Sequence, residues 1–225
     1  DLHIVRSSIA LVNATMHIPR LFLAILSISV FWTIGTVLFI QFPPLVKNVL
    51  HADKAVASLF LAIFSVGVAL GSVAINRLLQ GKVSARFAPA TVLTMGAFVV
   101  AFHFVCRMWD SGVAPGTLMT LGEFLAHDHA GWMVTALLGI AFSGGMFVVP
   151  LYAFLTTTVD KSEAARTVAA NNIVNSGAMV IGAVITLSMS AAGIAVTHQL
   201  LFAAAMSLVT AWLAQKLHLA CDGHD

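Results

Sequence analysis

Three asparagines in one apolar segment are the side chains best suited to bind a polar ligand. Asn171 and Asn175 are four residues apart and share one helix face, Asn172 lies beside them, and Arg166 precedes them by about one turn. Side-chain amides both donate and accept hydrogen bonds, and burying them costs free energy unless they find partners. We therefore expect them to face neighbouring helices or a water-filled cavity, as interhelical bonds or as a binding site.

A second group of residues predicts a place where the backbone bends or moves. Gly144, Gly145 and Pro150 interrupt another apolar segment, and Pro150 removes a backbone hydrogen bond, so a kink or a loosened turn is expected there. Broken helices at membrane depth usually line a cavity. The alternative is an ordinary packing kink, so the three residues are candidates for a hinge or gate.

The segment at residues 55–79 combines close packing with a basic end. Gly67 and Gly71 have the four-residue spacing that lets two helix backbones approach closely. Asn76 and Arg77 follow in a basic hairpin. This hairpin is either an anchor at the cytoplasmic face or a latch for a gate.

Two further constellations could do chemistry of other kinds. Ser143 and His198 invite comparison with an intramembrane serine protease, although Ser143 lacks the glycine expected two residues before it. His127, Asp128 and His129 are adjacent, but they supply too few fixed ligands for a strong metal site. We expect a solvated loop at these three residues, and nothing in the sequence predicts a metal or a cofactor.

The segments that carry these residues are long and apolar. The 225 residues are 60% hydrophobic and only 9% charged, which leaves too few charges for an ordinary soluble surface. Six stretches of about 20 mainly apolar residues are long enough to span a bilayer as helices. The predicted spans are residues 21–42, 55–79, 87–106, 132–159, 168–189 and 199–213. None of them contains an acidic residue.

Lysine and arginine placement predicts the orientation of the bundle. With the amino end in the cytoplasm, eight of the eleven basic residues fall on the cytoplasmic side and three outside, so both ends of the segment are expected in the cytoplasm. The longest connection, residues 107–131, divides the spans into three plus three. This count is typical of the inverted three-helix repeats that build half of a transporter.

The rest of the chain is expected to be short and peripheral. Residues 1–19 are weakly amphipathic and favour a cytoplasmic linker or interfacial helix, residues 20–217 form the six-helix unit, and residues 218–225 form a cytoplasmic tail. Because the chain opens on Asp1 without a methionine, we expect an excerpt from a longer protein. No basic stripe suited to nucleic acid is present in the sequence.

Two stretches of the sequence resemble a known family. The run VPLYAFLTTTVDKSEAARTVAANNIVNSGAMVIG at residues 149–182 is similar to the second half of the bacterial lysophospholipid transporters of the major facilitator superfamily. The run AILSISVFWTIGTVLFIQFP at residues 24–43 resembles that family's seventh helix. The superfamily's loop pattern of Gly, three residues and Asp-Arg falls here on Ser72 and Asn76-Arg77, so the sequence departs from that motif.

The resemblance implies helices seven to twelve of a twelve-helix transporter in a bacterial inner membrane. Its expected partners are the amino-terminal six-helix half, membrane lipids and, in some members, fused acyltransferase and acyl-carrier-protein synthetase domains. The implied cargo is a lysophospholipid, chiefly lysophosphatidylethanolamine, flipped between leaflets for reacylation. No enzymatic activity is expected of this segment itself. A major facilitator transporter of a drug, sugar or other solute is the alternative, because fold does not determine function.

A lysophospholipid carrier needs an apolar groove for one acyl chain and a polar track for the head group. The candidates for neutral hydrogen bonds to the head are Asn171, Asn172, Asn175, Gln41 and Tyr152. Arg166 is the candidate for pairing with the phosphate. Trp32 and Phe31 are candidates for contact with the acyl chain, with lipid-facing or core packing as the alternative.

Overall fold

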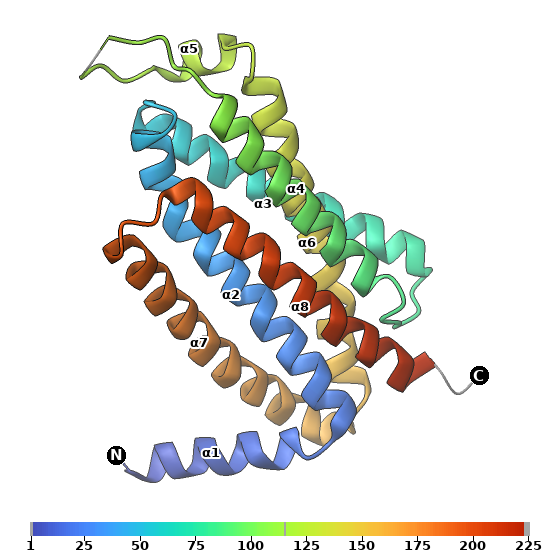
Figure 1. Cartoon of the computed structure of the whole chain (residues 1–225). Coiled ribbons are helices and arrows are strands. Elements are labelled where there is room, and N and C mark those ends of the chain that lie inside the picture. Colours follow the sequence, from blue (N-terminus) through green and yellow to red (C-terminus); the bar gives the residue numbers. More distant parts are fainter. Residues whose placement is uncertain (1, 115, 223–225) are drawn as a thin grey trace.

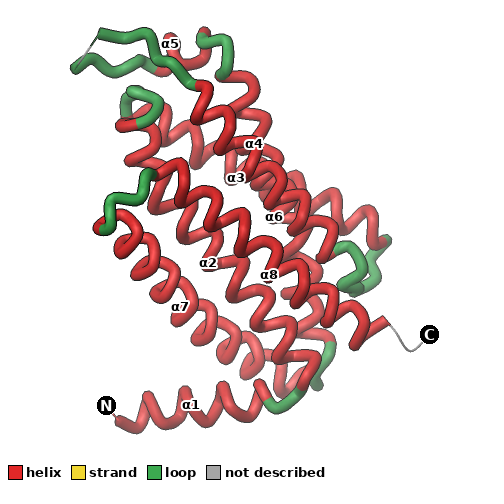
Figure 2. The backbone as a smooth tube through the Cα atoms, viewed as in Figure 1, coloured by secondary structure: helices red, strands yellow, loops and turns green. Residues whose placement is uncertain are grey.

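The computed structural model describes residues 2–114 and 116–222, and in this part of the chain the backbone is almost entirely helical (Figure 1; Figure 2). Six of its helices are long and apolar enough to cross a membrane. The predicted all-α fold with six helices of membrane-spanning length is therefore confirmed. The helices are α1 (Leu2–Met16), α2 (Pro19–Asn48), α3 (Lys54–Leu79), α4 (Ala88–Met108), α5 (Leu121–Ala126), α6 (Ala130–Thr157), α7 (Lys161–Ala191) and α8 (Val196–Asp222).

Most spanning helices extend beyond the stretches predicted from hydropathy. α2 runs on through Pro43 and Pro44 to Asn48, α7 begins at Lys161 rather than at residue 168, and α8 continues into the predicted tail. The reason is that hydropathy marks the part of a helix in hydrocarbon, whereas backbone hydrogen bonding continues into the interface. The boundaries predicted at residues 20 and 217 therefore fall within helices.

The two short helices lie at opposite ends of the bundle. α1 lies across the end at which α2 and α7 begin, and it contacts both of them (Figure 1). α5 lies in the long connection before α6 and was not predicted. Its first turn is closed by a capping box, in which the Thr120 hydroxyl accepts from the Glu123 amide and the Glu123 carboxylate accepts from the Thr120 amide.

Each spanning helix has a small set of neighbours. α6 packs against α3 and α4, α2 packs against α7 and α8, and α4 packs against α8. The contacts of α2 with α3, α2 with α6, and α6 with α7 are smaller. α3 and α7 are the least buried of the six. The core therefore lies between α2, α4, α6 and α8.

Glycines set the closest helix approaches, as the four-residue spacing predicted. A Cβ added at Gly71 would collide with the Phe142 carbonyl of α6, and one added at Gly145 would collide with the Val68 carbonyl of α3. On the other side of the bundle, a Cβ at Gly182 of α7 would lie 2.6 Å from the Thr33 methyl of α2. Only glycine allows these helix pairs to pack so closely.

The two ends of the bundle differ in charge. We call one end the basic end; it holds α1, the α3–α4 and α6–α7 connections and the end of α8, and its cations on or beside the spanning helices are Arg20, Arg77, Lys82, Arg86, Lys161, Arg166 and Lys216. We call the opposite end the α5 end. It holds α5 and the α2–α3 and α7–α8 connections.

Candidate functional site

A chain of side-chain hydrogen bonds joins α2, α6 and α7. The Ser29 hydroxyl donates to the Asn175 amide oxygen at 2.7 Å. The Asn175 nitrogen donates to the Tyr152 hydroxyl oxygen at 3.2 Å, and the Trp32 indole nitrogen donates to the same oxygen at 3.0 Å. We call Ser29, Trp32, Tyr152 and Asn175 the polar chain. Three residues of this group were predicted as binding candidates, and the structure brings those three together.

The polar chain carries no charge and is partly accessible. Ser29 and Asn175 are buried, whereas Trp32 and Tyr152 are half-buried. The Tyr152 hydroxyl oxygen accepts two bonds, and no acceptor for its own proton lies among the described residues. The phenol can therefore donate one hydrogen bond to a further group, such as a phosphate or carbonyl oxygen.

Asn171 and Asn172 lie one turn away from Asn175 toward the basic end, and they differ in exposure. Asn171 is fully buried, and Asn172 is exposed. The Asn171 nitrogen donates to the Asn172 amide oxygen at 3.5 Å, while the Asn171 oxygen has no partner in the described part of the chain. Leaving a buried acceptor unpaired costs about 1–3 kcal/mol. Asn171 therefore offers a site for a donor that is not part of this structure.

Arg166 lies away from the polar chain. It precedes Asn175 by nine residues, about 13 Å along α7 at a rise of ~1.5 Å per residue. Its guanidinium is half-exposed and lies 3.7 Å from the Glu163 carboxylate. Arg166 and Glu163 line a small cavity of about 340 Å³ beneath α1, together with Thr15, Asp160 and Thr167. Arg166 can meet a charged group at the basic end, but not one held by Asn175.

Gln41 was predicted with the asparagines, but the structure places it elsewhere. It follows Ser29 by twelve residues, about 18 Å along α2 at ~1.5 Å per residue. Its amide nitrogen donates to the Gln199 amide oxygen, and Gln199 donates to the Ser190 hydroxyl at 3.1 Å and the Ile194 carbonyl at 2.9 Å. Gln41 thus ties α2 to α8 and to the α7–α8 connection at the α5 end.

The aromatic candidates divide between core and polar chain. Phe31 is buried, and its ring centroid lies 5.4 Å from that of Phe147 and 5.7 Å from that of Trp32. A Cβ added at Gly144 would lie 3.2 Å from the Phe31 ring. Phe31 is therefore part of the α2–α6 packing, and Trp32 is the aromatic residue that joins the polar chain.

The candidate hinge residues have packing roles in this structure. Gly144 and Gly145 let α6 approach Phe31 and α3, and α6 continues without interruption through Pro150. Asn76 and Arg77 are exposed in the last turn of α3, at the basic end. The close approaches explain the two glycines in α6 without any need for motion.

The structure places Ser143 and His198 apart. Ser143 lies at the level of Met95, because a Cβ added at the next residue, Gly144, would be 3.6 Å from the Met95 sulfur. His198 lies at the level of His103, and the centroids of the two rings are 6.2 Å apart. His103 follows Met95 by eight residues, about 12 Å along α4 at ~1.5 Å per residue. The two side chains therefore do not form a nucleophile–base pair here.

His127 is held by two hydrogen bonds and by an aromatic contact. Its Nδ1 accepts from the His129 amide at 3.1 Å, so Nε2 carries the proton and donates to the Asp110 carbonyl at 2.8 Å. Its ring stacks on Trp109 at a centroid distance of 3.9 Å. Across the described residues, no group of three or more His, Cys, Asp and Glu side chains could hold a metal ion.

Two residues of these networks were missed by sequence reasoning. Ser29 was overlooked because a hydroxyl in an apolar run usually bonds to its own helix, as Ser27 does with the Leu23 carbonyl. Gln199 was counted only as the start of a span. The signal for both was weak: each is a polar side chain within a predicted span.

Comparison with protein-family models, with curated proteins and with solved structures gave no match to this chain.

Proposed function

We propose that this chain is one half of a membrane transporter built from two inverted three-helix repeats, α2–α4 and α6–α8. The helix neighbours support this. Exchanging α2 with α6, α3 with α7 and α4 with α8 turns the α3–α6 contact into α7–α2 and the α4–α6 contact into α8–α2, and it leaves α4–α8 unchanged. A two-fold relation between the triplets predicts this pattern.

We infer that the cargo is a lysophospholipid, chiefly lysophosphatidylethanolamine, and one observation carries the inference. The neutral polar chain is half-accessible and lies between otherwise apolar spanning helices. Neutral donors and acceptors bind a zwitterionic head group weakly enough to release it again. The apolar helices around them accommodate one acyl chain. The resemblance at residues 149–182 points to the same cargo.

The residues have distinct roles in this proposal. The Tyr152 hydroxyl proton donates to an oxygen of the head group. The Asn171 oxygen is buried and unpaired among the described residues in this conformation, and it accepts from the ammonium group once the helices around it move during transport. Arg166 pairs with the phosphate at an earlier step, near the basic end. Gln41 is not assigned to the head-group site in this proposal, because its amide nitrogen donates to Gln199 at the α5 end.

The proposed transporter also needs a second six-helix half, which is not part of this structure. An amino-terminal six-helix half packs against this one, and the two halves rock about the polar chain to expose it to each leaflet in turn. The basic end faces the cytoplasm of a bacterial cell, in agreement with the positive-inside rule. The membrane is the inner membrane, and an acyltransferase, fused or separate, consumes the flipped lipid.

Uptake of labelled lysophosphatidylethanolamine by spheroplasts tests the function. Cells expressing the full-length parent protein are compared with cells lacking it, with any fused acyltransferase inactivated. Protein-dependent label in the cytoplasmic leaflet is expected. If verified expression gives no uptake while a labelled sugar or drug is moved, the cargo assignment is wrong and another solute takes its place.

Variants on α7 test whether the asparagines bind the cargo, with normal expression as the check that the protein still folds. Asn171→Leu combined with Asn175→Leu is expected to abolish lysophospholipid uptake at normal expression. Ser176→Ala is the matched control, because Ser176 lies beside Asn175 but is exposed and bonds only to the Asn172 carbonyl of its own helix. Equal uptake by the double variant and the control would place the site elsewhere.

A further inference from the structure

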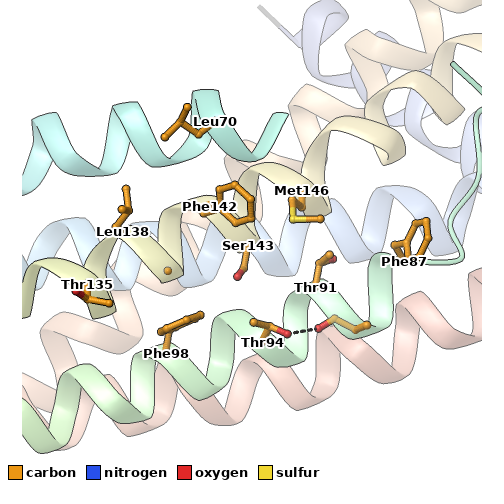
Figure 3. Close-up of a pocket in the computed structure, with 12 residues that line it drawn as sticks. Leu70, Phe87, Thr91, Thr94, Phe98, Thr135, Leu138, Phe142, Ser143 and Met146 are labelled. Atoms are coloured by element: carbon orange, nitrogen blue, oxygen red, sulfur yellow. Dashed lines mark hydrogen bonds between the residues drawn. The ribbon is translucent and has the colours of Figure 1, made fainter. Parts of the chain in front are cut away.

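A long apolar groove runs along the outside of the bundle between α3 and α4. Its volume is about 670 Å³ (Figure 3). Its lining includes Leu70 of α3, Phe87 at the N-cap of α4, Thr94 and Phe98 of α4, and Leu138 and Phe142 of α6. In the described part of the chain α3 and α4 do not contact each other, although both pack against α6. α6 is therefore the floor of the groove, and the two flanking helices are its walls.

The threonines of the groove add little polarity to it. The Thr94 hydroxyl donates to the Ala90 carbonyl at 2.9 Å, Thr91 to the Ala88 carbonyl at 3.0 Å, and Thr135 to the Gly131 carbonyl at 2.7 Å. Each hydroxyl is thus satisfied by its own helix. A ligand in this groove meets mainly methyl groups and aromatic rings, which suit a hydrocarbon chain.

The end of the groove nearest the basic end carries a fixed positive charge. Phe87 lines the groove there, and the Arg86 guanidinium lies over its ring at 4.4 Å from the centroid. Residues 77–86 contain Arg77, Lys82 and Arg86 and no acidic residue. A cluster of this kind at the membrane surface attracts anionic lipid head groups.

The length of the groove matches one leaflet of a bilayer. Phe87, the N-cap residue of α4, precedes Phe98 of that helix by eleven residues, about 16 Å at a rise of ~1.5 Å per residue. Half of a hydrocarbon core of ~30 Å is about 15 Å. A phospholipid whose phosphate lies at Arg86 can therefore lay one acyl chain along the groove to its far end.

We propose that this groove binds one anionic phospholipid of the leaflet that adjoins the basic end. One acyl chain lies on α6 between α3 and α4, and the phosphate pairs with Arg86 by charge-assisted hydrogen bonds. The site is separate from the polar chain on α2, α6 and α7. The proposal rests on the membrane location of the helices. It does not depend on which cargo the protein transports.

Native mass spectrometry of the full chain released from lipid nanodiscs tests the proposal. The nanodiscs contain phosphatidylglycerol or phosphatidylcholine, which carry the same acyl chains and differ in head-group charge. One phosphatidylglycerol is expected to stay bound, with occupancy several-fold above that of phosphatidylcholine. Equal retention of the two lipids would overturn the preference for an anionic head.

Two pairs of variants locate the lipid. Thr94→Phe fills the groove, and Leu93→Phe places the same ring on the adjacent exposed residue outside it. Both side chains face outward, so neither change disturbs the core. Thr94→Phe is expected to remove the bound lipid, and Leu93→Phe to keep it. Equal occupancy in the two, or a dimer that Thr94→Phe dissociates, would show that no acyl chain occupies the groove.

The second pair tests the head group. Arg86→Gln is compared with Lys216→Gln, because the Lys216 ammonium lies over the Trp212 ring at 4.0 Å and reproduces the same cation–aromatic contact on another helix. Arg86→Gln is expected to lower phosphatidylglycerol retention roughly tenfold, as for a lost charge-assisted hydrogen bond. The same retention in both variants would show that the phosphate is not held at Arg86.

Discussion

The Asn175 side-chain nitrogen lies 3.2 Å from the Tyr152 hydroxyl oxygen and donates to it. The same oxygen accepts from the Trp32 indole, so a single phenol oxygen joins α2, α6 and α7. Because two donors share this one acceptor, removing the Tyr152 oxygen breaks two of the three hydrogen bonds of the polar chain.

Tyr152→Phe is expected to destabilise the bundle by about 1–2 kcal/mol, because it leaves the Trp32 and Asn175 donors without an acceptor. Denaturant-induced unfolding in detergent micelles measures the change. Thr156→Val is the control, since the Thr156 hydroxyl is exposed and bonds only within α6. A Tyr152→Phe protein as stable as Thr156→Val would mean that the polar chain contributes nothing to the fold.

Gly71→Ala is expected to cost about 1–3 kcal/mol, because the new methyl collides with the Phe142 carbonyl and forces α3 away from α6. Gly177→Ala on α7 is the matched change, since nothing lies within 4 Å of the added Cβ. It is expected to be neutral or stabilising by up to about 1 kcal/mol. The free energies of unfolding of the two variants test this prediction. Equal losses of stability in the two variants would contradict the close packing of α3 against α6.

The stability of α5 is expected to fall at acidic pH. The Thr120 amide and hydroxyl donate to the Glu123 carboxylate at 2.7 and 2.9 Å, and they hold the pKa of Glu123 below its ordinary value. A lowered folded-state pKa means that the ionised carboxylate stabilises α5 above the unfolded-state pKa. This contribution is lost as the pH falls through the lowered value.

Amide hydrogen exchange in α5, corrected for the intrinsic rate, measures this loss of protection. Glu123→Gln keeps an acceptor for the Thr120 amide but does not titrate, so its protection is expected to stay constant over the same pH range. Parallel curves for the wild type and Glu123→Gln would show that another group causes the change.

The orientation of the bundle can be tested with single cysteines. After Cys106→Ala and Cys221→Ala, a cysteine is placed either by Asp128→Cys at the α5 end or by Val83→Cys at the basic end, where both original residues are exposed. A membrane-impermeant maleimide is expected to label the first in intact spheroplasts. It should label the second only after permeabilisation. The reverse pattern would invert the proposed topology.

The sequence alone determined the six spanning helices of this protein. Six spans could be predicted because hydropathy is a local property, and a helix in lipid must be apolar over about 20 residues whatever its neighbours are. The shared face of Asn171 and Asn175 followed from the helical period, and the close approach at Gly67 and Gly71 followed from side-chain size. The capping box of α5, Thr120 with Glu123, was a readable signal that was missed.

Only the tertiary structure decided which polar groups meet. Asn175 bonds to Ser29, 146 residues earlier in the chain, and Gln41 bonds to Gln199 rather than joining the asparagines. Periodicity shows which residues share a helix face, but the helix that this face meets depends on the packing of all six spans together. The groove between α3 and α4 has the same origin, because it exists only where two helices pack on α6 and not on each other.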